Sequence, residues 1–287
     1  MYAVEIRGLG KSYKTGKFKT VEALKGLSLS VEQGEVFGFL GPNGAGKSTT
    51  IKCLMGLIRP TSGAATIMGQ DISSPAAREQ VGYLPENPAF YDYLSAEEYL
   101  FFVGKVFGMS PERLERRSEE VLKLLELWEP RKRLIRTYSK GMVQRLGLAQ
   151  VLLHDPAVYI LDEPMSGLDP LGRALVKEVI LDLKRRGRCV FFSTHITEDV
   201  EKVCDRVAVI NKGELLLVER VEHILERGIE GYSVSLTGPD RQTEEIYVAK
   251  ADLQSFIQQS IGKDVSIDKI EPRRKDMEAL FLELVAR

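Results

Sequence analysis

The segment Gly41–Thr49 constrains this chain more than any other feature of its sequence. It follows the short apolar run Val36–Leu40, which is typical of a buried strand. From Lys47 onward, apolar residues recur every three to four positions, as they do on one face of a helix. Between the two, Gly41 to Ser48 fits the spacing G-x-x-x-x-G-K-[ST] in full. A strand, a glycine-rich turn and a helix in this order predict a backbone nest that binds phosphate groups.

Each residue type in this segment suits the binding of a nucleotide triphosphate. The glycines let successive N–H groups point inward, Lys47 reaches the β- and γ-phosphates, and the Ser48 hydroxyl ligates Mg²⁺. The expected ligand is therefore ATP with Mg²⁺. The predicted ATP-binding residues of the segment are Gly41, Pro42, Asn43, Gly44, Ala45, Gly46, Lys47, Ser48 and Thr49.

A second apolar run, Val158–Leu161, ends in two adjacent carboxylates, Asp162 and Glu163. In open α/β sheets, ligands bind beyond the carboxyl ends of the strands. Asp162 is therefore placed to bind Mg²⁺, and Glu163 to polarise the attacking water as general base. A solvated strand end is the alternative for such a pair alone, but the phosphate-binding segment favours the catalytic interpretation.

Apolar runs that alternate with helical patterns predict an α/β fold with a parallel sheet at its core. Further strands are expected at 65–68, 81–84, 190–193 and 206–210, with an amphipathic helix over 171–183. A stretch rich in Leu, Glu, Arg and Lys, from about Asn87 to Leu153, predicts an inserted helical subdomain. Ser95 and Glu98 have the spacing of a capping box there.

The sequence texture changes after about Glu219. Alternating runs at 232–237, 244–249 and 265–270, a turn at 238–240 and helices at 251–261 and 277–285 predict a small α+β module over residues 220–287. A length of 287 residues suits one large domain, residues 1–219, and such an appendage.

Composition excludes several functional classes. The chain has 40 basic and 41 acidic residues, and its net charge of −1 gives no electrostatic reason to expect a nucleic acid partner. No apolar run approaches the ~18 residues of a membrane span, and the first ten residues contain no signal-peptide core. Three cysteines without metal spacing are expected to be reduced thiols, as in a cytoplasmic protein.

Over residues 2–219 the chain resembles the nucleotide-binding subunit of ABC transporters, because several further motifs occur in that family's order. The segment Ser139–Arg145 resembles the signature segment, Ser166–Asp169 the D-loop, and Ser193–His195 the switch histidine. Tyr13 stands where the family has an aromatic residue that stacks on adenine. The resemblance implies a P-loop NTPase whose parallel sheet core carries an N-terminal antiparallel β-subdomain.

The resemblance also implies roles for these residues. Ser139 is expected to cap the helix that starts near Lys140. Ser139 and Gly141 contact the γ-phosphate that the other subunit binds, so that a head-to-tail dimer encloses two ATP molecules. His195 contacts the γ-phosphate and the attacking water, which makes Glu163, His195 and Lys47 the expected catalytic residues. Asp169 links the two sites across the dimer; its alternative role is an N-cap for the helix that opens at Pro170.

Two positions depart from the family's usual pattern. The signature reads Tyr-Ser-Lys-Gly-Met, in which Lys140 adds a cation where phosphate binds. After the strand at 81–84 the chain has Glu86 where the family usually has glutamine. Glu86 can still ligate Mg²⁺, with Ser48 and Asp162, but when ionised it cannot donate a hydrogen bond. The Leu-Pro-Glu form of this segment resembles bacterial exporter-type ATPases.

These features indicate an ATPase that drives transport, with export favoured, through separately encoded membrane permease subunits, at the inner face of the cell membrane. Phe90, Tyr91, Tyr93 and Leu94 are expected to help form the groove that receives the permease; a packed hinge of the helical subdomain is an equal alternative. The competing functions are a soluble ABC ATPase that acts on nucleic acid or the ribosome, and a nucleotide-gated regulator without turnover. Intact motifs in one chain allow a homodimer, and a heterodimer is the alternative.

Overall fold

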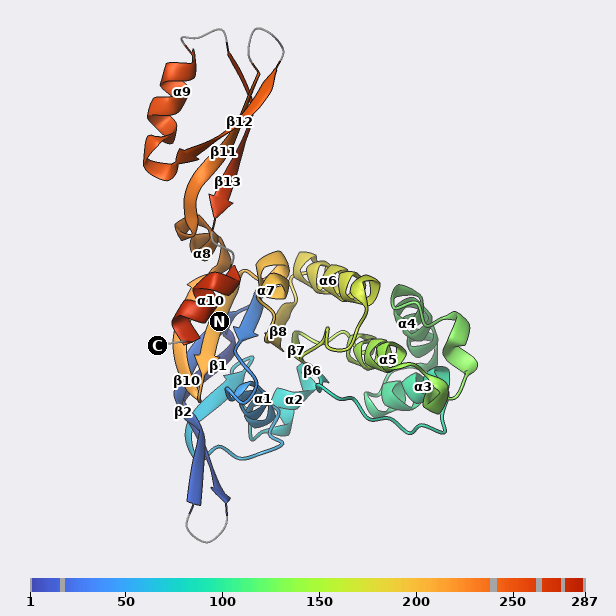
Figure 1. Ribbon diagram of the computed structural model, residues 1–287. Helices are drawn as coiled ribbons and strands as arrows, with labels where there is room; N and C mark the ends of the chain where they lie inside the picture. Colours follow the sequence, from blue (N-terminus) through green and yellow to red (C-terminus); the bar gives the residue numbers. More distant parts are fainter. Residues whose placement is uncertain (1, 16–18, 238–241, 262–264, 275–276, 286–287) are drawn as a thin grey trace. The chain divides into compact units, whose positions relative to one another are not determined.

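The computed structural model describes residues 2–15, 19–237, 242–261, 265–274 and 277–285 (Figure 1). The chain divides into two compact units, Met1–Val218 and Glu219–Arg287. Within the described residues, no helix has both the length and the apolar character that a membrane span needs. Cys53, Cys189 and Cys204 are buried as free thiols.

A six-stranded sheet forms the centre of the first unit, in the order β10-β9-β3-β8-β7-β6. The strands from β9 to β6 pair in parallel. Every residue of β3, β7 and β8 is buried, as expected of parallel strands with both faces covered. The strands are β3 (Val36–Leu40), β6 (Val81–Leu84), β7 (Val158–Asp162), β8 (Cys189–Thr194), β9 (Arg206–Asn211) and β10 (Glu214–Arg220).

The register of these strands aligns their carboxyl ends. Leu40 at the end of β3 lies opposite Thr194 of β8, and Asp162 at the end of β7 lies opposite Ser193. The segments that follow the three strands therefore leave the sheet at one edge. Most of the residues that carry the predicted chemistry lie in these segments.

A smaller antiparallel sheet, in the order β2-β1-β4-β5, belongs to the same unit. Its strands are β1 (Tyr2–Thr15), β2 (Lys19–Glu32), β4 (Ser62–Ile67) and β5 (Gln70–Asp71). We predicted that the strand now called β4 spans 65–68, and it begins three residues earlier. The strand passes through Gly63, whose φ is 76° and which leaves no room for a Cβ atom against the backbone of Gly8.

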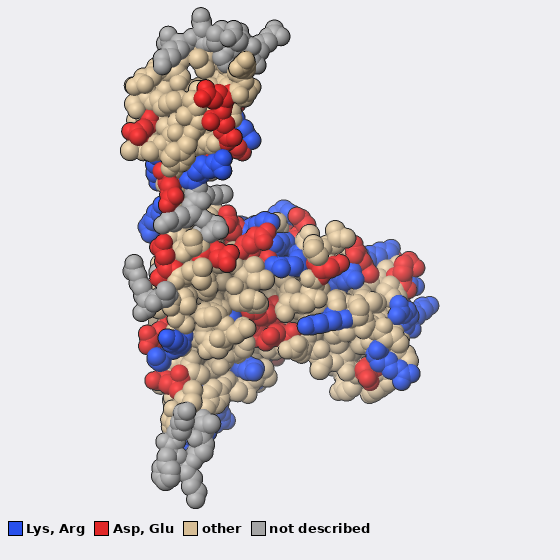
Figure 2. Space-filling view, in the orientation of Figure 1, with Lys and Arg blue, Asp and Glu red and all other residues tan. Residues whose placement is uncertain are grey.

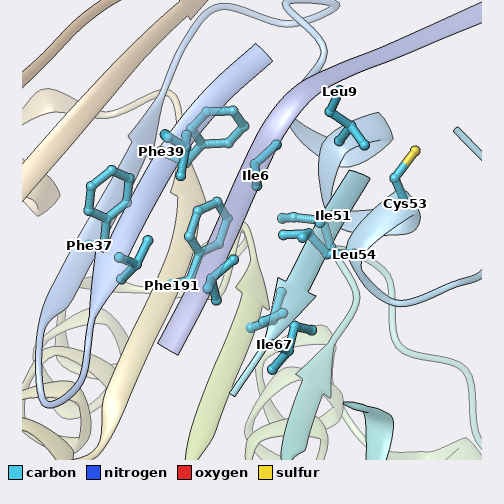
Figure 3. Packing of buried hydrophobic residues seen from close by; sticks show 14 of the residues in the cluster. Ile6, Leu9, Phe37, Phe39, Ile51, Cys53, Leu54, Ile67 and Phe191 are labelled. Atoms are coloured by element: carbon cyan, nitrogen blue, oxygen red, sulfur yellow. The ribbon is translucent and has the colours of Figure 1, made fainter. Parts of the chain in front are cut away.

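The main hydrophobic core lies between the two sheets and helix α1 (Lys47–Leu54). Figure 3 shows side chains from both sheets and α1 packed together there. The Phe191 ring of β8 lies 5.8 Å from that of Phe37 and 5.4 Å from that of Phe39, both on β3. Burial of each such side chain contributes roughly 1.5–3 kcal/mol. This core fixes α1, the helix that follows the phosphate-binding loop, against the sheet.

The inserted helical subdomain consists of α3 (Ala96–Val106), α4 (Pro111–Leu124) and α5 (Lys140–Leu153), with short 3₁₀ turns at Glu129–Lys132 and Ile135–Thr137. The predicted capping box is confirmed: Glu98 N donates to Ser95 Oγ at 3.3 Å, and Ser95 N donates to Glu98 Oε2 at 2.8 Å. The helical part begins at residue 96. Residues 87–94 form the non-helical connection to it.

Two helices that matter for the site cover the central sheet. Helix α6 (Pro170–Arg185) packs on β8 and α7 (Thr197–Val203) packs on β3 and β8, and the two helices also contact each other. Helix α6 is the amphipathic helix predicted over 171–183, and Gly187 with φ 68° follows its C-cap. The remaining helix of this unit, the short α2 (Pro75–Glu79), lies between β5 and β6 in the chain.

The second unit is built on a three-stranded antiparallel sheet, β12-β11-β13. Val234, Leu236 and Val248 form its small core, against which Leu253 and Phe256 pack. The helix predicted from Ala251 begins instead at Leu253, because residues 250–252 form a 3₁₀ turn. The predicted turn at 238–240 lies outside the described residues. The elements are α8 (Val221–Arg227), β11 (Ile229–Thr237), β12 (Thr243–Ala249), α9 (Leu253–Ile261), β13 (Ser266–Arg274) and α10 (Met277–Val285).

His154 caps the C-terminal end of α5 and stacks on Phe107, with ring centroids 3.8 Å apart. Burial lowers the pKa of His154 below its usual value of 6.5, because a buried imidazole resists taking up charge. As the pH falls through 6.5, the unfolded chain therefore binds a proton more readily than the folded protein does. The folded state loses stability in that range.

We expect His154→Phe to weaken this acid dependence, because phenylalanine keeps the stack on Phe107 and takes up no proton. Between about pH 7 and about pH 5, the Tm of the wild-type protein should fall further than that of the variant. At about pH 8 both rings are neutral, and the difference between the two Tm values there serves as the reference. Parallel Tm curves over the whole range would contradict the prediction.

Candidate active site

The loop between β3 and α1, Gly41–Gly46, is held by backbone contacts on both sides. Gly41 N donates to the Thr194 carbonyl of β8 at 3.3 Å. The Ala45 carbonyl accepts a hydrogen bond of 2.9 Å from Gly213 N, in the turn between β9 and β10. Gly44 and Gly46 have φ values of 77° and 113°, which side chains other than glycine rarely tolerate. The loop is thereby fixed in a curled form with α1 starting directly behind it.

A pocket of about 330 Å³ opens at this loop. Its size lies in the range of small-molecule binding sites. The helix α1 behind it has Gly46 as its N-cap without a capping side chain, so its amino-terminal N–H groups remain for a ligand. The pocket is lined by Ala23, Pro42, Asn43, Gly44, Ala45, Gly46, Lys47, Ser48, Thr49, Glu86 and Glu163.

Lys47 is the buried cation of this pocket, with only 6% of its surface exposed. Its Nζ donates to the carbonyl of Gly41 at 2.7 Å and to that of Pro42 at 3.3 Å. The same Nζ lies 3.4 Å from Glu163 Oε1. A buried ammonium is stable only when it is paired and hydrogen-bonded in this way. These contacts hold its charge beside the phosphate-binding loop.

Glu163 follows β7 with a φ of 49°, a left-handed backbone that is uncommon outside glycine. The backbone N–H of Glu163 donates to the Ser193 carbonyl at 3.2 Å and to the Ser193 Oγ at 3.1 Å. These bonds hold the residue in a conformation that costs on the order of 1–3 kcal/mol. Its side chain consequently turns into the pocket, where it meets Lys47.

His195 lies on the other side of the Glu163 carboxylate. Its Nδ1 is 3.1 Å from both Oε1 and Oε2 of Glu163, while about half of the imidazole, 47%, is exposed. The structure thus brings the three predicted catalytic residues into one continuous chain of contacts, Lys47–Glu163–His195. The chain joins one buried cation, one carboxylate and one exposed imidazole at the mouth of the pocket.

Two residues of the site were not assigned a role from the sequence. Ser193 Oγ donates to Asp162 Oδ1 at 2.5 Å and also accepts the Glu163 N–H, so it orients the Asp162 carboxylate and holds the Glu163 backbone. Its position next to His195 in the chain was a usable signal. Ala23 of β2 lines the pocket from the antiparallel sheet, and nothing in its local sequence marks it.

Comparison with known proteins identifies the family to which this chain belongs. Residues 24–166 match the ABC transporter family. An ABC transporter ATP-binding protein of Synechocystis sp. is 46% identical over 250 residues, which cover 86% of this chain and 70% of that protein. The ABC transporter ATP-binding protein YxlF of Bacillus subtilis is 35% identical over 302 residues, covering 98% of this chain and 99% of YxlF. This chain is a member of the ABC transporter family. It is an ATP-binding subunit.

A further relative of this ABC subunit is the linearmycin resistance ATP-binding protein LnrL of Bacillus subtilis, 39% identical over 75% of this chain and 68% of LnrL. Among solved structures, the ATP-binding subunit of an ABC transporter superposes with a TM-score of 0.71 at 32% identity, covering 77% of this chain and 91% of that one. The ATP-binding cassette MJ0796, a dimer bound to ADP and Pi, gives a TM-score of 0.71 at 25% identity over 76% and 98%. The predicted P-loop NTPase fold is confirmed.

Five predicted nucleotide contacts of the ABC subunit lie outside the pocket lining: Tyr13, Gly41, Ser139, Gly141 and Asp169. Ser139 is the N-cap of α5, where its Oγ accepts a hydrogen bond from Met142 N at 3.2 Å, as predicted. Gly141 lies in the first turn of that helix. Asp169 caps α6 through a 2.9 Å bond from Gly172 N to its Oδ1, so the alternative role weighed for Asp169 is present. Their contacts to nucleotide remain predictions.

Tyr13, predicted to stack on adenine, also lies outside the pocket lining. It is on β1, with 39% of its surface exposed. The Lys11 ammonium sits 5.1 Å from the centroid of its ring. One face of the ring therefore takes part in a cation–π contact within the chain.

The predicted magnesium ligands of the ABC subunit are a hydroxyl and two carboxylates, the oxygen donors that Mg²⁺ prefers. Ser48 and Glu86 line the same pocket. Asp162, only 2% exposed, lies at the adjacent strand end and is oriented by Ser193. Mg²⁺ usually combines one or two carboxylates with substrate phosphates and water. The donor set fits this ion.

The two left-handed glycines of the loop provide a matched test of the pocket. A Cβ atom on Gly46 would lie 2.8 Å from the Ala23 carbonyl oxygen, whereas one on Gly44 meets nothing within 4 Å. We expect Gly44→Ala to lower the free energy of unfolding by about 1 kcal/mol, because of backbone strain alone. Gly46→Ala should lower it by about 3 kcal/mol, because the loop must also move. ATP affinity, measured by equilibrium binding, should fall much further for Gly46→Ala. Equal losses for both variants would contradict the pocket geometry.

Proposed function

We propose that this ABC subunit hydrolyses ATP and drives transport, as an exporter, through separately encoded membrane subunits. The observation that carries the proposal is the contact chain Lys47–Glu163–His195 at the mouth of the phosphate-binding pocket. A binding protein without turnover has no need of a carboxylate held in a left-handed conformation beside an imidazole. Strained residues of this kind cluster at sites where chemistry occurs.

The reaction is an in-line attack of water on the γ-phosphorus. Glu163 accepts the proton of the attacking water, the bond between the γ-phosphorus and the bridging oxygen breaks, and ADP leaves with that oxygen. Lys47 supplies positive charge to the phosphate oxygens as negative charge develops on them. His195 contacts both oxygens of Glu163 and thereby keeps the carboxylate directed at the water. Because about half of its imidazole is exposed, His195 can also contact the γ-phosphate. When bound, Mg²⁺ supplies further positive charge to the β- and γ-phosphates, and Ser48, Asp162 and Glu86 would hold it.

We further propose that a complete site needs two subunits. Ser139 and Gly141 lie outside the lining of the pocket formed by their own chain. The first turn of α5 holds no acidic residue, so its amino-terminal N–H groups can bind an anion from another subunit. A head-to-tail dimer would place this helix over the γ-phosphate of the partner and Asp169 beside the opposite site. The related cassette MJ0796 is a dimer in its solved structure, which supports the dimeric part of this proposal.

The surface proposed for the membrane permease is aromatic. Tyr91 and Tyr93 are 52% and 65% exposed, and the Tyr91 ring lies 5.9 Å from that of Phe102, which is also exposed. Phe90 instead packs edge-on against Tyr99 at 4.9 Å, so the hinge alternative describes Phe90 better. Exposed aromatic clusters mark sites of protein contact. We define Tyr91, Tyr93 and Phe102 as the aromatic patch.

We propose that this subunit works at the inner face of the membrane, and further observations support export over a nucleic acid partner. LnrL, a relative, is named for resistance to linearmycin, and resistance fits export of a compound.

Figure 2 shows acidic and basic side chains interspersed on the visible face, which gives no electrostatic support to a nucleic acid partner. We assign the nucleotide chemistry to the first unit, to which every described residue of the pocket lining belongs, and an accessory role to the second.

The variant Glu163→Gln tests the enzyme and the dimer together. Glutamine keeps the shape of the side chain and cannot accept the proton, so the variant should bind ATP without hydrolysing it. We expect its mass in solution to double on addition of Mg-ATP, as measured by light scattering. Lys47→Ala, which lacks the phosphate-binding cation, should stay monomeric and serves as the control.

The outcomes separate the parts of this proposal. A Glu163→Gln protein that binds ATP and stays monomeric would refute the homodimer and favour closure with the permease or a different cassette. If the protein is dimeric without ATP, the dimer interface does not depend on the nucleotide, and the second unit becomes the first candidate for that interface. ATP turnover by Glu163→Gln at the wild-type rate would remove Glu163 as the general base.

Substitution of the aromatic patch tests the permease surface. We expect the double variant Tyr91→Ala/Tyr93→Ala to keep its ATP affinity, because neither residue lines the pocket. Its recovery with the membrane fraction of cells that express the permease should fall severalfold. Tyr247→Ala, which removes an equally exposed tyrosine from the second unit, is the matched control. Unchanged recovery of the double variant would refute this role.

A further inference from the structure

One buried carboxylate near the site has no part in the mechanism above. Asp199 lies in the first turn of α7 and is 1% exposed. Arg173 Nη2 lies 2.9 Å from both of its oxygens, and Lys177 Nζ lies 2.8 Å from Oδ1. Arg173 and Lys177 are one turn apart on α6, so two cations of one helix converge on a single carboxylate of another.

This arrangement is costly unless the geometry it fixes is needed. Removing a carboxylate from water is unfavourable, and well-packed apolar residues often give an equally stable contact between helices. Charged pairs, in contrast, define one relative position of the two helices, because the donors and acceptors match at one register only. The buried triad therefore fixes α7 on α6 more narrowly than apolar packing would.

The two helices that the triad joins lead directly from the reacting groups. Helix α7 begins two residues after His195, and Asp199 is four residues after it. Helix α6 begins after Asp169, in the chain segment that starts at Glu163, and Arg173 stands ten residues after Glu163. The triad thus closes a loop of contacts: Glu163 meets His195 at the pocket, and the segments behind them meet at Asp199.

The opposite end of α6 is attached by similar contacts that lead away from the pocket. Lys184 pairs with Asp205 at 2.6 Å, and Arg186 pairs with Asp155 at 2.7 Å, where Arg188 also contacts Asp155. Figure 2 shows Lys, Arg, Asp and Glu side chains side by side along the edge of the face where α6 and α7 lie. Asp155 therefore offers an internal comparison: it is a carboxylate with two cationic partners, Arg186 and Arg188, and it precedes the amino-terminal end of β7, whereas Glu163 follows the carboxyl end of that strand.

We propose that Asp199 is a positioning residue, which fixes His195 against Glu163 by anchoring α7 to Arg173 and Lys177 of α6. The inference rests on the proposed ATPase function. The triad should affect turnover and not nucleotide binding, because the pocket lining at 42–49 belongs to the loop after β3 and to α1, which the triad does not hold. Loss of the triad should leave ATP binding intact and impair the chemical step.

Steady-state ATPase assays of the full chain test this. We expect Asp199→Asn to lower kcat about tenfold or more while the KM for ATP and the equilibrium ATP affinity stay within about twofold of wild type. Asp199→Glu, which keeps the charge, should recover part of the lost kcat. Arg173→Gln provides a second route to the same effect and leaves Asp199 paired with Lys177. Asp155→Asn, the matched control, should lower Tm without lowering kcat.

A measurement that does not depend on turnover follows His195 itself. The chain has three histidines, so imidazole NMR signals of ¹⁵N-histidine protein can be assigned with a His195→Gln variant. We expect the His195 signal to shift in Asp199→Asn and in Arg173→Gln, and to keep its position in Asp155→Asn. A merely structural role for Asp199 would lower Tm and leave this signal where it is.

The results distinguish the two proposals. Wild-type kcat in a folded Asp199→Asn protein would overturn the positioning role, as would a loss of ATP affinity equal to the loss of kcat. If the wild-type chain itself shows no turnover, the ATPase proposal fails. In that case an unmoved His195 signal in Asp199→Asn overturns the positioning role, and a shifted signal supports it.

Discussion

The register of three buried parallel strands is the constraint on which the site depends. Because β3, β8 and β7 pair residue by residue, the phosphate-binding loop, His195 and the two carboxylates leave the sheet at one edge. None of these groups could reach the others if one strand slipped by a single residue, since a slip would also turn the apolar side chains of that strand to the wrong face. The phenylalanine cluster behind the strands holds that register. Packing in the core therefore decides the geometry of the chemistry.

At this edge the protein keeps several charges out of water, and each has a compensating partner. Lys47 is neutralised by Glu163 and by two carbonyl groups, and Asp162 is oriented by the Ser193 hydroxyl. Buried charges without such partners would cost several kcal/mol each. The same partners aim the side chains, so stability and catalytic geometry come from one set of contacts. When ATP binds, Lys47 can exchange these protein partners for phosphate oxygens, and because its ammonium is already out of water, the exchange adds no new desolvation cost.

The sequence was most informative where structure is decided locally. The phosphate-binding segment, the capping box at Ser95 and the cap of α5 at Ser139 each depend on a few neighbouring residues, and their structures match the prediction. The alternative weighed for Asp169, a helix cap, was also local, and the structure has it.

Features that depend on distant contacts were not predictable in the same way. The start of β4 depends on how closely Gly63 approaches Gly8, and the place of Ala23 in the pocket depends on how one sheet lies against another. Of the four apolar residues after Glu86, only the structure separates the packed Phe90 from the exposed Tyr91 and Tyr93. Neither local spacing nor residue type tells these apart, because the difference lies in what each ring meets across the fold.

The turn between β9 and β10 has a consequence for how this chain can change in evolution. Surface turns with two left-handed residues, here Lys212 and Gly213, are ordinarily places where extra residues are accepted at little cost. Gly213, however, donates its N–H to Ala45 of the phosphate-binding loop and accepts one from Lys25. An insertion at this turn would withdraw the hydrogen bond that supports the loop. A hairpin tip that looks free to vary in length is therefore bound to the two-residue form by the nucleotide pocket behind it.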